Sequence, residues 1–431
     1  MIYEDLLSLW IAYLLWEFLP ALYFKVSPEF KIFLFVGKEL FFLLSLLFIF
    51  KKPKISNPFK SQVLERIFIL LAFLFFSLDI TLFNFKAFFS SYYFGDFFII
   101  FWFLHYYFLI KIFFYRLNFE YFRILLGLYF PFFLLILADE SFNFFNFHFP
   151  GQFLLFLLVI LMLSPYFIIK IWPVRRVREG YFRELLDEFF KKVNLKIKDY
   201  LVLPKLGAKF YTAGVLGFIP PYRYLFFSEG LLEILSPEEV LGVLAHETGH
   251  LKKKHGFFLF LLLLTFPMSL LNFLYFVLLL FSLFFESAEE IAQFLKGPYG
   301  VYFDIGLGLT LLFYSLFFFR VIFAYLLRSL EREADLYALA LLGDPMPLIS
   351  SLYKIGEITG QLYRKSWHHY GLWERIQYLR YASEHPEVIH KHSLRLRRIF
   401  LLWVLLNLLM LFIFNYLGAG ILEKILKIFF P

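Results

Sequence analysis

The sequence predicts an all-α membrane protein with about nine transmembrane helices and a mostly helical polar domain that carries a small β element. Of the 431 residues, 61 % are hydrophobic and only 18 % are charged. The mean hydropathy of +0.72 is not that of an ordinary soluble domain. Nine stretches are apolar over most of the roughly 20 residues that a span needs, and two long polar segments interrupt them.

The predicted spans run in chain order as Leu6–Phe24, Ile32–Phe50, Ile67–Phe85, Phe97–Phe114, Ile124–Leu137, Phe153–Ile171, Phe257–Phe285, Val301–Leu327 and Ile399–Leu417. Together with the polar segments they divide the chain into five parts. These are an N-terminal membrane domain of about six spans (1–172), a polar segment (173–256), a transmembrane hairpin (257–327), a second polar segment (328–398) and a C-terminal span with its tail (399–431).

The distribution of basic residues predicts the orientation of the spans. If both polar segments face the cytoplasm, 32 of the 42 lysines and arginines lie on inside loops, as the positive-inside rule requires. We therefore expect a multi-pass protein of the cell membrane, with its N-terminus and both polar segments on the cytoplasmic side. The net charge of +8 then reflects topology, and the expected partner is the lipid bilayer and no nucleic acid. The absence of cysteine excludes disulfides and thiolate-ligated metals.

Several predicted spans contain ionisable side chains, which are costly in lipid and usually face a bundle interior or a water-filled cavity. For any single residue, mutual ion pairing or snorkelling near a span end is the more ordinary explanation. Together they indicate a polar interior of the membrane domain: Glu17, Lys38, Glu39, Asp79, His105, Lys111, Asp304 and Arg320.

The end of the first polar segment predicts a helix that carries chemistry. Ser236 is a capping residue, Pro237 suits the first helical position, and Glu239 stands three residues after the cap to complete a capping box. On this helix, His246 and His250 are four residues apart, so their imidazoles project from one face. Two neutral imidazole nitrogens at this spacing bind zinc, and Glu247 beside them can act as general base. The alternative is a polar turn near the membrane with incidental histidines, continued by Lys252–His255.

A zinc ion held by two histidines needs a third protein ligand. The run that begins at Arg328 is predicted to be helical to about Gly343 and places Glu331 and Asp335 four apart on one face. This pattern suits a carboxylate ligand, Glu331, and an acid, Asp335, that hydrogen-bonds the other nitrogen of a ligating histidine. Glu333 competes as a ligand but points about 160° away from Asp335. Taken alone, the segment also fits a surface helix with a mixed-charge face.

A third polar element lies in the stretch that contains His369 and Arg375. These two residues could supply a hydrogen-bond donor and an orienting charge for an oxyanion. Without its context, the stretch reads as the solvated start of a helix.

Together these segments resemble the integral-membrane zinc metalloproteases that include the CAAX prenyl endopeptidases and the HtpX-like heat-shock proteases. The resemblance covers roughly residues 200–380. Its motifs are His246-Glu247-x-x-His250, Arg328-x-x-Glu331-x-x-Ala334-Asp335, Phe227-Ser-Glu-Gly-Leu-Leu and His369-x-x-Leu372-x-Glu374-Arg375-Ile376. Tyr370 stands where the family usually has proline.

The resemblance implies a cytoplasmic, gluzincin-like zinc-protease domain that binds one zinc ion per chain. It implies His246, His250 and Glu331 as the zinc ligands and Glu247 as the catalytic base and acid. It further implies Asp335 behind a ligand, and His369 with Arg375 near the oxyanion. An extended substrate would pair with an edge strand near 209–213.

We therefore predict a zinc metalloendopeptidase that hydrolyses membrane-associated or misfolded proteins, its substrates being peptides or membrane proteins. The sequence does not choose between prenylated C-terminal peptides and misfolded membrane proteins. Two other classes stay open. One is a zinc-protease-like membrane sensor or receptor, and the other is a transporter-like bundle in which the histidines are structural.

Overall fold

The structure, a computed structural model, describes residues 8–9, 11–13, 15–16, 19, 27–51, 58–89, 95–115, 119–145, 152–205, 211–217, 219–364 and 370–417. The chain divides into two compact units. The first unit comprises Met1–Leu125, Tyr129–Leu157 and Ala292–Phe313, and the second comprises Leu126–Leu128, Leu158–Ile291 and Tyr314–Pro431. The helices with residues in the first unit are α2 (Pro28–Lys51), α3 (Pro58–Thr81), α4 (Phe85–Phe89), α5 (Gly95–Tyr115), α6 (Phe119–Phe144), α7 (Gln152–Ile171), α12 (Ala288–Lys296) and α13 (Gly300–Phe317).

Charged side chains of the first unit pair with one another between helices. Lys38 on α2 contacts Asp79 on α3, and the Tyr106 hydroxyl on α5 donates to Asp79 Oδ2 over 2.9 Å. Lys111 Nζ lies 2.8 Å from Glu65 Oε1. Lys38, Asp79 and Lys111, which the sequence places within predicted spans, thus each have an oppositely charged partner, which lowers the cost of keeping them in an apolar environment.

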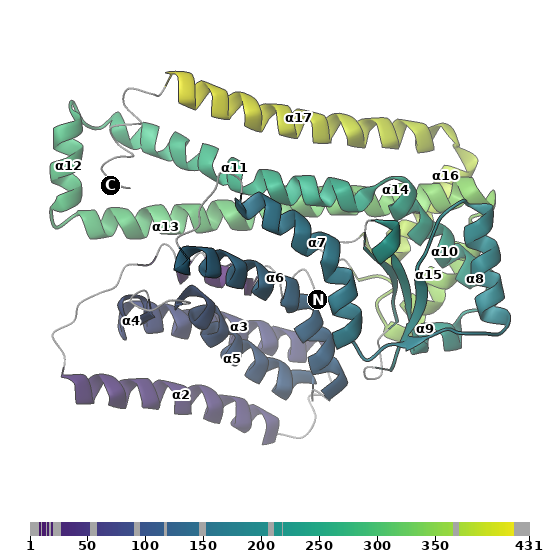
Figure 1. Cartoon of the computed structure of the whole chain (residues 1–431), viewed down its shortest axis with the longest axis horizontal. Helices are drawn as coiled ribbons and strands as arrows, with labels where there is room; N and C mark the ends of the chain where they lie inside the picture. Colours follow the sequence, from purple (N-terminus) through teal and green to yellow (C-terminus); the bar gives the residue numbers. More distant parts are fainter. Residues whose placement is uncertain are drawn as a thin grey trace. The chain divides into compact units, whose positions relative to one another are not determined.

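The second unit contains a four-stranded sheet in the order β1-β2-β4-β3. Strands β2 (Asp199–Leu203) and β4 (Tyr224–Ser228) run parallel. Strand β1 (Arg175–Arg176) pairs with β2, and β3 (Ala213–Leu216) pairs with β4, both antiparallel. Helix α8 (Tyr181–Lys192) connects β1 to β2, and α9 (Glu229–Ile234) follows β4. Figure 1 shows these strands beside α8, α9, α10 and α15.

Helix α10 (Pro237–Lys252) forms the centre of this unit. It begins with the capping box that the sequence predicts, because Ser236 and Glu239 each bind the other's backbone N–H. The helix packs against α14 (Ala324–Leu342) and α15 (Met346–Thr359). Glycines allow this close approach, since a Cβ on Gly249 would lie 2.9 Å from Ala334 Cα. The unit also contains α11 (His255–Ser282), the π-helical segment η2 (Phe318–Phe323), α16 (Leu372–Glu384) and α17 (Glu387–Leu417).

Five helices among the described residues are long and apolar enough to cross a membrane, and they cover Pro28–Ile49, Phe122–Phe142, His255–Ser282, Gly300–Leu342 and Glu387–Phe414. Shorter apolar helices at Phe101–Phe114 and Leu155–Ile171 coincide with two further predicted stretches. The first predicted stretch lies largely outside the described residues. The outward side chains of α17, such as Leu402 and Phe412, are exposed apolar groups that suit lipid. This is a mostly helical multi-pass membrane protein, for which nine spans remains a prediction.

Candidate metal centre and active site

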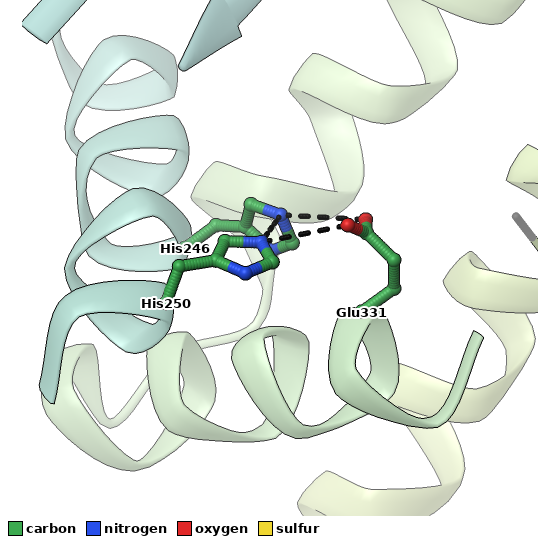
Figure 2. Close-up of side chains that lie close together, drawn as sticks. All are labelled: His246, His250 and Glu331. Atoms are coloured by element: carbon green, nitrogen blue, oxygen red, sulfur yellow. Dashed lines mark hydrogen bonds and ion pairs between the residues drawn. The ribbon is translucent and has the colours of Figure 1, made fainter. Parts of the chain in front are cut away.

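Three potential ligands from two helices converge in the second unit. The spacing of four on α10 brings His246 Nε2 and His250 Nε2 to 3.2 Å from each other. Glu331 on α14 faces both rings, with its oxygens 3.7 Å from His246 Nε2 and 3.5 Å from His250 Nε2. Figure 2 shows one nitrogen of each imidazole directed at this carboxylate. Among the described residues, this is the group of His, Asp and Glu side chains that could hold a metal ion.

The donor atoms of this group fit a tetrahedral ion. An ion bound at about 2.0–2.2 Å to each donor separates any two tetrahedral donors by about 3.3–3.6 Å. The two Nε2 atoms lie 3.2 Å apart, His246 Nε2 lies 3.7 Å from Glu331 Oε2, and His250 Nε2 lies 3.5 Å from Glu331 Oε1, so each of these pairs is close to that range. Two imidazole nitrogens and one carboxylate oxygen are also a common donor set for catalytic zinc. The residues present therefore fit zinc with one coordination position left open.

His246 is held from behind by a buried ion pair. Its Nδ1 lies 2.9 Å from Asp335 Oδ1. Arg375 on α16 donates to both oxygens of Asp335, from Nε over 2.9 Å and from Nη2 over 2.7 Å. This bidentate pair fixes the carboxylate, so His246 presents Nε2 to the centre. Nδ1 of His246 thus lies at ion-pair distance from Asp335, but the angles at this contact do not meet those of a hydrogen bond. That Asp335 hydrogen-bonds a ligating histidine stays a prediction.

Burial and the neighbouring charges set the protonation of the site. Burial lowers the pKa of His250 to about 3, so this imidazole is neutral near pH 7. Burial also lowers the pKa of His246, but contact with Asp335 outweighs it and the pKa is raised overall. For Glu247, burial raises the pKa to about 7, and the charge of Glu331 acts in the same direction. Burial thus shifts the pKa values of His250 and Glu247 away from their usual ranges, as is common at functional sites.

Most of the predicted site residues lie close together in the structure. His246, His250, Glu331, Asp335 and Arg375 form one connected group, and Arg375 Nη1 lies 3.8 Å from Glu331. Glu247 directly follows His246 on α10 and is partly buried.

One predicted site residue lies outside the described part of the chain, and the competing ligand candidate points away from the group, as its helical position predicts. His369 lies outside the described residues. Glu333, considered as a competing ligand, instead contacts His255. The sequence did not identify His255 as a site residue, because it reads as the end of a polar turn. The break after α10, which redirects this residue, is not visible in the local sequence pattern.

The fold and the donor set together define a class, the membrane zinc metalloproteases whose metal helix carries H-E-x-x-H. Residues 177–399, just over half of the chain, match the model of peptidase family M48, and the chain belongs to this family. It is a metalloprotease, as the sequence predicted.

Among solved structures, the crystal structure of S. mikatae Ste24p is similar, with a TM-score of 0.48 and 15 % sequence identity. The match covers 82 % of this chain and 99 % of that chain. No curated protein matches the sequence.

Proposed function

We propose that this metalloprotease is a membrane-embedded endopeptidase that binds one zinc ion per chain through His246, His250 and Glu331. Its substrates would be membrane-associated or misfolded proteins. The observation that carries the proposal is the convergence of two imidazole Nε2 atoms and one carboxylate within 4.8 Å of one another. This donor set leaves one position for water or a substrate carbonyl.

The chemistry follows from the residues around that position. Zinc, when bound, supplies Lewis acidity toward a peptide carbonyl and toward water. Glu247 accepts the proton of the attacking water and passes it to the leaving amine. Asp335 keeps His246 in the tautomer that offers Nε2, and Arg375 holds Asp335 and adds positive charge beside the site. For His369 we keep the role of oxyanion donor, on the strength of the sequence alone.

Strand β3 is the proposed docking edge for the substrate. Among the described residues, it pairs with β4 on one side only. Thr212 and Ser228 face each other as a bonded pair, because Ser228 N–H donates to the Thr212 carbonyl over 2.8 Å. Bonded and non-bonded pairs alternate in antiparallel ladders, so Val215 N–H points away from β4. A substrate strand would accept this outward bond.

Replacing Val215 by proline tests this edge. Proline removes the outward N–H and leaves the bonds to β4 intact, so we expect kcat/KM to fall about 2- to 10-fold, the worth of one backbone hydrogen bond. The matched control, Val215→Ala, keeps the N–H and should cleave like the parent. Equal kcat/KM for the proline variant and the alanine variant would remove β3 from the proposal.

The proposed orientation of the protein in the membrane is based on the distribution of its basic residues. The two polar segments, 173–256 and 328–398, hold most of the Lys and Arg of the chain, which supports a cytoplasmic location for the site. The zinc helix precedes the predicted hairpin 257–327, and the Glu331 helix follows it. We therefore propose an active site at the cytoplasmic face of the cell membrane, close to substrates that are themselves membrane-bound.

Metal removal tests the proposed function. The full-length protein in detergent is stripped with a chelator and assayed on casein, with and without added zinc. We expect cleavage to fall at least about 100-fold on stripping and to return with one zinc per chain, because Glu247 alone cannot activate water. A prenylated C-terminal peptide assayed in parallel distinguishes narrow from broad substrates. Cleavage that survives stripping would contradict the proposal. If zinc binds but neither substrate is cleaved, the result would favour a sensor. If no zinc binds, the result would favour a structural role for the histidines.

A further inference from the structure

The second zinc ligand of the proposed site has its own hydrogen-bonded support. His250 directs Nε2 at Glu331, and its other nitrogen, Nδ1, lies 2.9 Å from Nδ1 of His255. His255 is 1 % exposed, and its Nε2 lies 3.0 Å from Glu333 Oε2. An imidazole thus stands between the ligand His250 and a buried carboxylate.

The carboxylate at the end of this contact is held in turn. The Ser393 hydroxyl on α17 donates to Glu333 Oε1 over 2.5 Å. Lys253 Nζ lies 3.6 Å from the same oxygen and donates to Ser393 Oγ over 3.3 Å. Lys253 and Ser393 also line a cavity of about 360 Å³. The negative charge of Glu333 is therefore balanced at its outer end, as a buried carboxylate requires.

The break between α10 and α11 is what brings His255 to His250. In a continuous helix, a residue five positions on is rotated by about 140° and cannot face the first. Here α10 ends at Lys252, and Lys254 adopts a left-handed conformation with φ 58°. A non-glycine residue in this region is uncommon and needs support from its surroundings. The turn redirects the chain so that His255 opens α11 against the ring of His250.

We propose that His255, Glu333 and Ser393 form a hydrogen-bonded chain that positions His250 as a metal ligand and fixes its tautomer. The proposal rests on the proposed zinc site. When His250 offers the Nε2 lone pair, Nδ1 carries the proton and donates it to His255 Nδ1. His255 then carries its own proton on Nε2 and donates it to Glu333. With neutral imidazoles and an ionised Glu333, this is the one arrangement that places a proton both between His250 and His255 and between His255 and Glu333.

The chain mirrors the support of the first ligand. His246 meets its carboxylate, Asp335, directly, whereas His250 meets Glu333 through one imidazole. Groups that hold a ligating histidine in this way typically change metal affinity by about 10- to 100-fold when they are removed. The chain also joins His250 to α17 through Ser393, so the start of the last membrane helix takes part in placing a zinc ligand.

The role of this hydrogen-bonded chain is tested by measuring the zinc affinity of full-length variants in detergent. We expect His255→Phe and Glu333→Gln each to weaken zinc binding about 10- to 100-fold in competition with a chromophoric chelator. Ser393→Ala should weaken it less, and Ser393→Thr, which keeps the hydroxyl, should restore it. The cobalt-substituted variants should show a shifted d–d absorption band, since the orientation of one ligand changes. A purely structural residue would lower the melting temperature of the zinc-free protein and leave this band in place.

His385→Asn is the matched control, because His385 is an exposed histidine near a carboxylate, with Nδ1 3.6 Å from Glu387. Its zinc affinity should equal that of the parent. If the parent binds zinc tightly and the His255, Glu333 and Ser393 variants bind it within about 2-fold of the parent, the chain has no positioning role. If the parent itself binds no zinc, the proposed metal site fails and this inference fails with it. Should His255→Phe not fold, the Glu333 and Ser393 variants decide.

Discussion

Glu247→Gln is expected to abolish peptide cleavage and to leave zinc binding unchanged. The amide has the shape of the carboxylate but accepts no proton, so general-base catalysis, worth about 10²- to 10⁴-fold, is lost. Glu247 is not one of the three clustered donors, His246, His250 and Glu331, so the metal should stay. We expect casein cleavage to fall at least about 100-fold, with one zinc per chain in both proteins by metal analysis.

The matched control is another Glu→Gln change in the same unit, at a position far from the chemistry. Glu357 on α15 is exposed, so Glu357→Gln should cleave casein like the parent. If Glu247→Gln keeps more than a tenth of the parental rate and binds zinc equally, another group must activate the water. A simultaneous loss of zinc would instead place Glu247 among the residues that hold the metal.

The helical positions of the chemistry could be predicted because helix periodicity depends only on sequence spacing. His246 and His250, four apart, share a face whatever they pack against, and so do Glu331 and Asp335. The capping box at Ser236 fixed the start of the helix by local hydrogen bonds alone. Apolar runs such as 257–285 predicted helices because lipid leaves no partner for unpaired backbone groups.

Packing between helices decided what the sequence could not reveal. Gly249 lets α10 approach Ala334 on α14, a contact between distant segments that no local pattern encodes. The same holds for His255, whose direction depends on the left-handed turn at Lys254. The helical spacing predicted that Glu333 points away from the three ligands. It does so, and it contacts His255, which in turn contacts His250. The number of spans also depends on which apolar helices meet lipid rather than protein.

Glu331→Gln is expected to have the second large effect, the loss of zinc from a folded protein. The carboxylate faces His246 and His250 at 3.7 and 3.5 Å and is the only anionic donor of the three. A neutral amide oxygen is a poor zinc ligand, since protein zinc sites use thiolate, imidazole and carboxylate. We expect zinc affinity to fall at least about 100-fold, or about 2.7 kcal/mol, and cleavage to disappear at low zinc.

The fold should survive this change because Glu331 is partly exposed and the buried pair of Asp335 and Arg375 stays intact. Removing one charge also leaves no isolated buried cation, since Arg375 keeps its bidentate partner. The melting temperature of the zinc-free variant should therefore match that of the zinc-free parent. High zinc should restore part of the cleavage, because Glu247 is still present. If the variant binds zinc as tightly as the parent, the third ligand is another residue, and the convergence of α10 and α14 has a structural role only.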